Sequence, residues 1–174
     1  MNGVVIDTNV FVAAGFNSGS AAARILAAVR EEHFLLVWNK PTRGETETIL
    51  RRIPGLDWLR VADLFRPEGE FTGPVDPDTF VMIADRGDRK FVALSAAATT
   101  PLVTNDNHVL AQQRAVGMEI LSPRAFVARD GLDIYERALR EDKSHGTLAF
   151  GQCGCAAGHH VVRASGSVSR RACT

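Results

Sequence analysis

Four acidic residues occupy positions from which they could do chemistry together. Asp7 and Asp106 each follow a short apolar run that predicts a buried strand, while Glu45 and Asp88 lie near the starts of predicted helices. In an open parallel sheet, ligands bind outside the carboxyl ends of the strands. We therefore expect the four carboxylates to share one edge of the sheet.

Carboxylates crowded at one edge repel one another unless a cation neutralises them or some remain protonated. Oxygen ligands of this kind suit Mg²⁺ or Mn²⁺ rather than zinc. Such a metal binds phosphate oxygens and lowers the pKa of a water molecule, which then attacks phosphorus. The pattern therefore indicates metal-dependent phosphodiester hydrolysis.

Each acid alone has a simpler interpretation. Asp7, Asp88 and Asp106 stand where a helix favours an acidic cap or first turn, and Glu45 is also near a helix start. Capping and metal binding do not exclude each other. The joint occurrence of the four acids favours the metal site.

The apolar periodicity predicts short strands alternating with helices. The predicted strands are residues 3–6, 34–38, 101–106 and 118–121, and the predicted helices are 20–30, 40–53, 55–65, 88–100, 107–117 and 122–129. Residues 66–78 are expected to form a loop, with one edge strand near Phe71. This alternation is typical of an α/β fold: a three-layer α/β/α sandwich with a central, mainly parallel sheet of about four to five strands.

We expect one folded domain over residues 1–129, a C-terminal helix over 130–143 and a disordered Gly-, Ser- and Ala-rich tail over 144–174. The tail holds a C-x-C…HH pattern made by Cys153, Cys155, His159 and His160. Its spacing matches no structural zinc finger, so a non-native or frame-altered C-terminal extension competes with a zinc site as the interpretation.

Charge and composition narrow the classes of function. The chain has 20 basic and 20 acidic residues, so no overall basic field gathers nucleic acid and any such binding needs a local patch. No apolar run is long enough to cross a bilayer, and the N-terminus has no signal-peptide pattern. With all three cysteines near the C-terminus, we expect a cytoplasmic protein without a disulfide framework.

Four motifs occur in the order "VVIDTNVFVAA", "GETETIL", "DRKFVALSAAA" and "LVTNDNHVL". Together they resemble the PIN-domain family, in particular the bacterial PIN proteins that are toxins of toxin–antitoxin pairs. The resemblance runs from about Val4 to Val127. It implies that residues 1–129 form a PIN-like nuclease domain.

The resemblance also assigns roles to residues. It makes Mg²⁺ (or Mn²⁺) the cofactor, and it gives Asn9 and Thr104 supporting roles as hydrogen-bonding residues. The metal-site acids that it implies are Asp7, Glu45, Asp88 and Asp106. Glu47 competes for the place of Glu45, but residues two apart on a helix point about 200° apart, so only one of them can face the site. Asp85 competes with Asp88, and the motif "DRKFVALS" favours Asp88.

The expected function is that of a metal-dependent endoribonuclease, the toxin of a type II pair. As the resemblance implies, its partners are RNA, a cognate antitoxin and a second copy of the chain. A PIN-fold protein that binds partners without cutting RNA is the alternative. A haloacid-dehalogenase-like phosphatase is a weaker one, because such enzymes need an acid where Asn9 stands.

Other polar and aromatic residues have ordinary interpretations beside functional ones. His108 is expected on an exposed helix surface, and Trp38 and Trp58 are expected in or near the core. The basic residues could contact phosphates or form solvated helix faces; they are Arg51, Arg52, Arg60, Arg86, Arg89 and Lys90.

Overall fold

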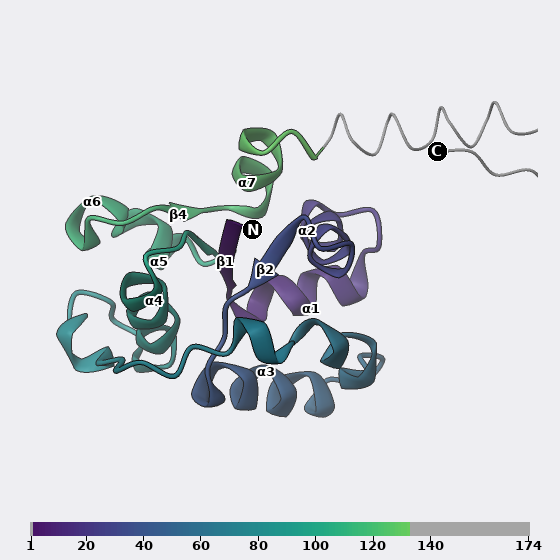
Figure 1. Cartoon of the computed structure of the whole chain (residues 1–174), viewed down its shortest axis with the longest axis horizontal. Coiled ribbons are helices and arrows are strands. Elements are labelled where there is room, and N and C mark those ends of the chain that lie inside the picture. Colours follow the sequence, from purple (N-terminus) through teal and green to yellow (C-terminus); the bar gives the residue numbers. More distant parts are fainter. Residues whose placement is uncertain (1, 133–174) are drawn as a thin grey trace, which may run out of the picture.

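The central element is a sheet of four parallel strands, and the computed structural model describes residues 2–132 around it. Its strand order is β2-β1-β3-β4 (Figure 1). The strands are β1 (Asn2–Ile6), β2 (Phe34–Leu36), β3 (Leu102–Val103) and β4 (Ile120–Leu121). The α/β prediction is therefore confirmed, with four strands that are all parallel.

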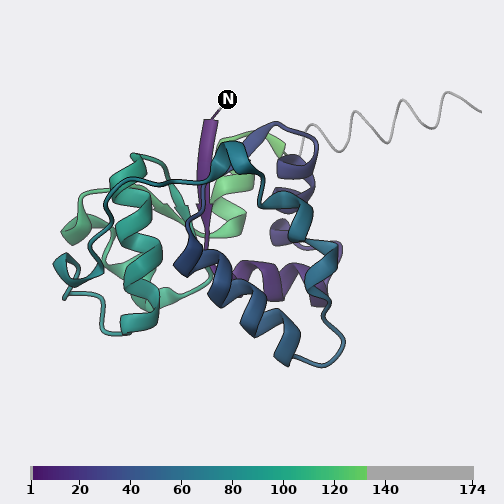
Figure 2. The ribbon, with the colours of Figure 1, turned by 60° about the horizontal axis from the view of Figure 1, so that its bottom comes forward.

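Helices cover both faces of this sheet. They are α1 (Thr8–Phe16), α2 (Ala21–Arg30), α3 (Lys40–Arg52), α4 (Arg86–Ala98), α5 (Asn107–Ala111), α6 (Gln113–Val116) and α7 (Pro123–Arg129). Figures 1 and 2 show β1 between α4 on one side and α1 and α2 on the other.

The side chains on the two faces of β1 belong to two separate hydrophobic clusters. Val4 and Ile6 pack with α1, α2 and α7, whereas Val5 packs with α4 and α5. The same alternation continues in β3, where Val103 joins the first cluster and Leu102 the second. Successive side chains of a strand point to opposite faces, so these short apolar strands are buried on both sides.

The helix starts follow the expected capping chemistry. The hydroxyls of Ser20 and Ser122 accept hydrogen bonds at the starts of α2 and α7, and Asp85 caps α4. Asn39 and Thr42 form a reciprocal capping box at the start of α3. These side chains satisfy amide groups that would otherwise lack partners at the ends of the helices.

The predicted helix over residues 55–65 is wrong. The segment forms two 3₁₀ turns, η1 (Trp58–Arg60) and η2 (Ala62–Leu64). The Asp57 carboxylate accepts from the amide of Leu59, and the guanidinium of Arg30 donates to the carbonyl of Arg60 at 2.7 Å. These side-chain bonds take backbone groups that an α-helix would use.

Several predicted elements are shorter than expected. The strand predicted over 34–38 ends at Leu36, after which Trp38 makes an isolated bridge with Glu70; this bridge replaces the edge strand expected near Phe71. The helix predicted over 107–117 is divided into α5 and α6. The loop predicted over 66–78 contains two further 3₁₀ turns, η3 (Pro67–Gly69) and η4 (Pro77–Thr79).

The predicted helix over 130–143 lies outside the described residues except for its first three positions, and the predicted tail lies wholly outside them. Within residues 2–132, no single helix is long and apolar enough to span a membrane. Only α1 and α2 taken together pass such a test, and they are bent by 105° at the break between them.

A close backbone contact at Gly69 gives a test of the fold. A Cβ atom at Gly69 would lie 2.0 Å from the carbonyl oxygen of Leu36, and the carbonyl of Gly69 accepts from the amide of Trp38. Gly69→Ala must therefore push η3 away from β2. We expect it to lower the free energy of unfolding by about 1–3 kcal/mol, the usual range for overpacking, as measured by urea denaturation.

Gly44→Ala is the matched control. A Cβ at Gly44 meets nothing within 4 Å, and the residue lies inside α3. This substitution should raise stability by up to about 1 kcal/mol, because alanine favours helix more than glycine does. Equal effects of the two substitutions would contradict the contact seen at Gly69.

Candidate functional site

The site lies at the point in the sheet where the order of strand addition reverses, between β1 and β3. From β1 the chain passes to β2 on one side, and from there it returns to β3 on the other side of β1. At such a switch point the loops leave in opposite directions and open a crevice at the carboxyl ends of the strands. Asp7 directly follows β1, and Thr104 to Asp106 follow β3.

The Asp7 carboxylate is buried and bonded across this switch point. Its side chain is only 4 % exposed, and Oδ2 accepts from the Thr104 hydroxyl at 2.6 Å and from the Asn9 amide at 2.7 Å. Asp7 occupies the N-cap position of α1 but makes no side-chain capping bond there. The local capping interpretation of Asp7 therefore does not describe what its carboxylate does.

Thr104 connects the two strand ends through one hydroxyl group. Its hydrogen goes to Asp7, and its oxygen accepts from the Asn9 side chain at 3.2 Å and from the amide of Asp106 at 3.0 Å. A hydroxyl has one hydrogen and two lone pairs, so Thr104 uses its full capacity. The Asn9 carbonyl in turn accepts from the amide of Asn105 at 3.0 Å.

Asp106 caps a helix and also lies at the carboxyl edge of the sheet. Its Oδ1 accepts from the amides of His108 at 2.6 Å and Val109 at 3.4 Å, at the start of α5. The other carboxylate oxygen takes part in neither bond. For Asp106 the capping and site interpretations hold together.

Glu45 reaches the same edge from α3. Thr8, the first residue of α1, lies 3.4 Å from Glu45 Oε1 and 3.0 Å from the Thr46 hydroxyl. Thr46 also donates to the carbonyl of Thr42 at 3.0 Å. Thr8 donates to the Glu45 carboxylate, and this bond is longer than the contact between the Thr8 and Thr46 hydroxyls.

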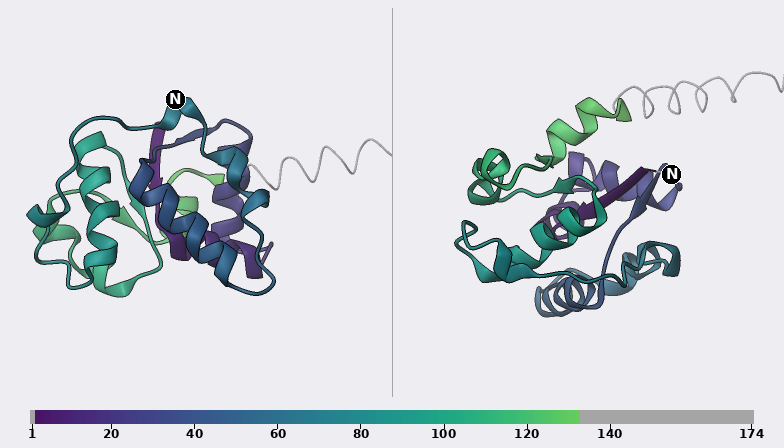
Figure 3. Two further views of the ribbon diagram at one scale, coloured as in Figure 1. Left: turned by 90° about the horizontal axis from the view of Figure 1, so that it is seen from below. Right: turned by 60° about the vertical axis from the view of Figure 1, so that its left-hand side comes forward.

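The second carboxylate oxygen of Glu45 forms an ion pair with Lys90 of α4. Figure 3 shows α3 and α4, the two helices that this pair connects. Glu47 instead pairs with Arg51 one helical turn along α3, at 2.8 Å. The two glutamates thus have separate partners, and Glu45 is the one that contacts the first turn of α1.

Asp88 lies in the first turn of α4, while Asp85 forms the cap. Within residues 2–132 the Asp88 carboxylate has neither a hydrogen bond nor an ion pair. Its partial burial, together with the negative charges of Asp7, Asp85, Asp106 and Glu45, raises its pKa from 3.8 to about 6. Three carboxylates from distant parts of the chain, and that of Asp85 nearby in sequence, are therefore near enough to act on Asp88.

Burial also raises the pKa of Asp7, and the negative charge of Glu45 adds to this effect. The hydrogen bond from Thr104 acts in the opposite direction, because it stabilises the ionised carboxylate. A carboxylate that stays buried in this way must be neutralised by a proton or a cation.

The donor set has the chemistry that a hard divalent cation requires. All four predicted acids offer carboxylate oxygens, the ligands of Mg²⁺ and Mn²⁺. In the part of the chain that the structure describes, no three acidic, histidine or cysteine side chains converge closely enough to hold a metal. The acids therefore fit a metal by type and neighbourhood, but they need side-chain rotation to close around one.

The other residues considered in the sequence have separate outcomes. Trp38 and Trp58 are buried in the core and His108 is exposed, as expected. Arg89 does not face outward for phosphate, because its guanidinium donates to the carbonyls of Ile83 and Val81. The cysteine–histidine pattern of the tail lies outside the described residues.

The sequence interpretation missed two contacts of this edge. The Thr8–Thr46 pair had a local signal, since Thr8 follows Asp7 directly. The Lys90–Glu45 pair had none, because its members lie on different helices; Lys90 was expected to contact phosphate or to lie on a solvated helix face.

The raised pKa of Asp88 predicts how stability depends on pH without metal. The folded protein binds more protons than the unfolded chain between about pH 4 and pH 6, so the contribution of Asp88 to stability falls as pH rises through this window. Asp88→Asn removes the dependence. In a chelating buffer, the variant should melt near the parental temperature at pH 4 and above it at pH 7. A melting difference that is constant across this range would contradict the crowding of charges.

The comparisons with known proteins agree with this geometry. The family model described as PIN domain matches residues 3–108, a span that contains β3, all of β1 except its first residue, and all four acids. No curated protein matches the chain. Since the match covers more than half of the 174 residues, the chain belongs to the PIN-domain family.

Proposed function

We propose that this protein is a metal-dependent endoribonuclease and the toxin of a type II toxin–antitoxin pair. PIN domains are generally nucleases, and they typically use divalent metals. The observation that carries the proposal is that Asp7, Glu45 and Asp106 lie near enough to Asp88 for their charges to raise its pKa. A fold that served only as a binding scaffold would gain no stability from keeping four repelling carboxylates together.

The four acids would hold Mg²⁺ or Mn²⁺. When bound, such an ion polarises the phosphate and lowers the pKa of a water molecule that attacks phosphorus. Asp7 brings a charge whose position is set by Thr104 and Asn9. Asp106 is held by α5, so these two carboxylates need little rearrangement.

Glu45 and Asp88 are the more adaptable members of the set. Each comes from a helix beside the sheet, and neither accepts a hydrogen bond shorter than 3.4 Å from an uncharged donor within residues 2–132. Rotation of these two side chains is the change that would complete a metal site. A bound cation would also lower the pKa of Asp88, because it stabilises the ionised form.

RNA is the proposed substrate, in the cytoplasm, and a cognate antitoxin and a second copy of the chain are the proposed protein partners. The support for these partners is the motif resemblance to bacterial PIN toxins. We call the part of the sheet edge with Asp7, Glu45, Asp88 and Asp106 the acidic edge. Because the chain has no net charge, RNA contact must rely on local groups around it.

Asp7→Asn tests the catalytic role of the buried carboxylate. Asparagine keeps the shape of the side chain but brings no negative charge. Stability without metal should hold or rise, because a repelling charge is gone. The rate of cleavage of single-stranded RNA in Mg²⁺ or Mn²⁺ should fall by more than about 100-fold. Loss of a residue that only hydrogen-bonds a metal ligand costs less, about 10- to 100-fold.

Asp57→Asn is the matched control for this experiment. It makes the same chemical change at the cap of η1, away from the acidic edge, and should leave the cleavage rate unchanged. An Asp7→Asn protein that cuts RNA at the parental rate would instead favour the alternative of a PIN-fold binding protein.

The toxin assignment has its own test in living cells. Expression of the chain in a bacterial host should stop growth, and Asp7→Asn should restore growth at equal protein levels. If the purified protein cleaves RNA while its expression leaves growth unaffected, the nuclease part of the proposal stands and the toxin part fails.

A further inference from the structure

Lys90 is a cation that the fold itself places at the acidic edge. It lies on α4 two residues beyond Asp88, yet its ammonium group contacts Glu45 of α3. Both side chains are half-buried, with 22 % of Lys90 and 27 % of Glu45 exposed. The pair therefore joins two helices at the rim and is more shielded from water than an ordinary surface pair.

The contacts of Glu45 are unequal on its two sides. Toward α1, Oε1 has only a long hydrogen bond of 3.4 Å from the Thr8 hydroxyl. Toward α4, Oε2 has the charged ammonium of Lys90. A close pair of two ionised groups is stronger than a long hydrogen bond from a neutral hydroxyl, so Lys90 decides where the carboxylate lies.

We propose that Lys90 is a positioning residue that competes with the divalent metal: it holds Glu45 in the metal-free protein and must release it when metal binds. This inference rests on the proposed metal-dependent function. It explains why the acidic edge has the right ligands while no three of the described side chains yet converge on one point. It also explains how the fold tolerates the crowded acids without metal, since Lys90 neutralises one of them.

The competition has a direct thermodynamic consequence. Metal binding in the parental protein includes the cost of breaking the Lys90–Glu45 pair. Lys90→Met keeps most of the apolar length of the side chain and removes this cost. The variant should therefore bind Mn²⁺ about three- to fivefold more tightly, the size expected for losing one partly exposed ion pair, and should melt at a lower temperature without metal.

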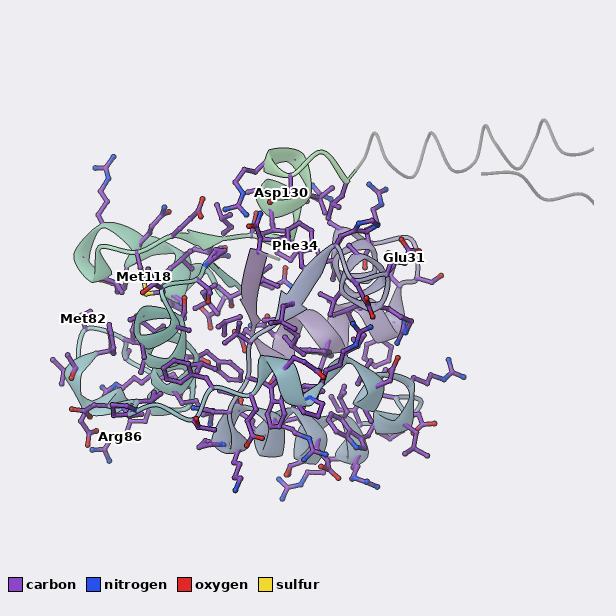
Figure 4. The ribbon with its side chains drawn as sticks, viewed as in Figure 1. Glu31, Phe34, Met82, Arg86, Met118 and Asp130 are labelled. Atoms are coloured by element: carbon purple, nitrogen blue, oxygen red, sulfur yellow. The ribbon has the colours of Figure 1, made fainter. Side chains whose placement is uncertain are left out.

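Two controls separate competition from a general effect of charge. Arg86→Met removes a positive charge from the same helix, at a side chain that Figure 4 shows at the periphery of the molecule. Arg51→Met breaks the ion pair with Glu47 on α3. Both should bind Mn²⁺ with parental affinity, and Lys90→Arg, which keeps a cation beside Glu45, should stay within about twofold of it.

The experiment is titration calorimetry of Mn²⁺ into each full-length variant, with melting curves in chelator. Tighter Mn²⁺ binding by Lys90→Met alone, together with a lower metal-free melting temperature, supports the proposal. Parental affinity in Lys90→Met overturns it, as does an equal gain in Arg86→Met. If RNA cleavage then shows only a raised KM in Lys90→Met, the residue contacts phosphate instead.

Failure of the proposed function has a different signature. In that case neither the parental protein nor any variant binds Mn²⁺ at millimolar concentration. Binding by the parental protein with no difference in Lys90→Met leaves the metal-dependent function intact and removes only the role of Lys90.

Discussion

Burial of one carboxylate between two parallel strands is the constraint on which the rest of this site depends. An ionised group out of water costs several kcal/mol unless it is paired or hydrogen-bonded. Asp7 is almost fully buried, and the Thr104 hydroxyl and the Asn9 amide offset this cost. Since Thr104 also holds the backbone of Asp106, satisfying one buried charge fixes the relative position of both strand ends.

Charge balance then shapes the second half of the edge. Glu45 and Asp88 come from helices, where a side chain can rotate more freely than one bonded between strands. The pKa of Asp88 rises to about 6 because of its partial burial and four nearby acids, whereas Glu45 has Lys90 beside it. Hydrogen bonds thus hold Asp7 and Asp106 in place, whereas Lys90 or a raised pKa reduces the repulsion at Glu45 and Asp88.

The sequence predicted what depends on neighbours along the chain. The helices expected over 20–30 and 122–129 form as α2 and α7, and the polar residues after two apolar runs located Asp7 and Asp106 at strand ends. It failed where partners are distant. The bond from Arg30 to the carbonyl of Arg60 replaces a predicted helix with 3₁₀ turns, and the Lys90–Glu45 pair depends on two helices meeting. Periodicity contains no information on such contacts.

The bond between Asp7 and Thr104 spans 97 positions of the chain and has a consequence for the timing of assembly. Contacts this far apart form only after the intervening segments have been ordered, which makes folding slow relative to helix formation. On a ribosome, β1 emerges first, and the Asp7 carboxylate gains its hydrogen bond from Thr104 only after β3 has been made. A nascent chain that ends before residue 104 therefore has no acidic edge, so any activity of that edge begins only when nearly the whole domain has been synthesised.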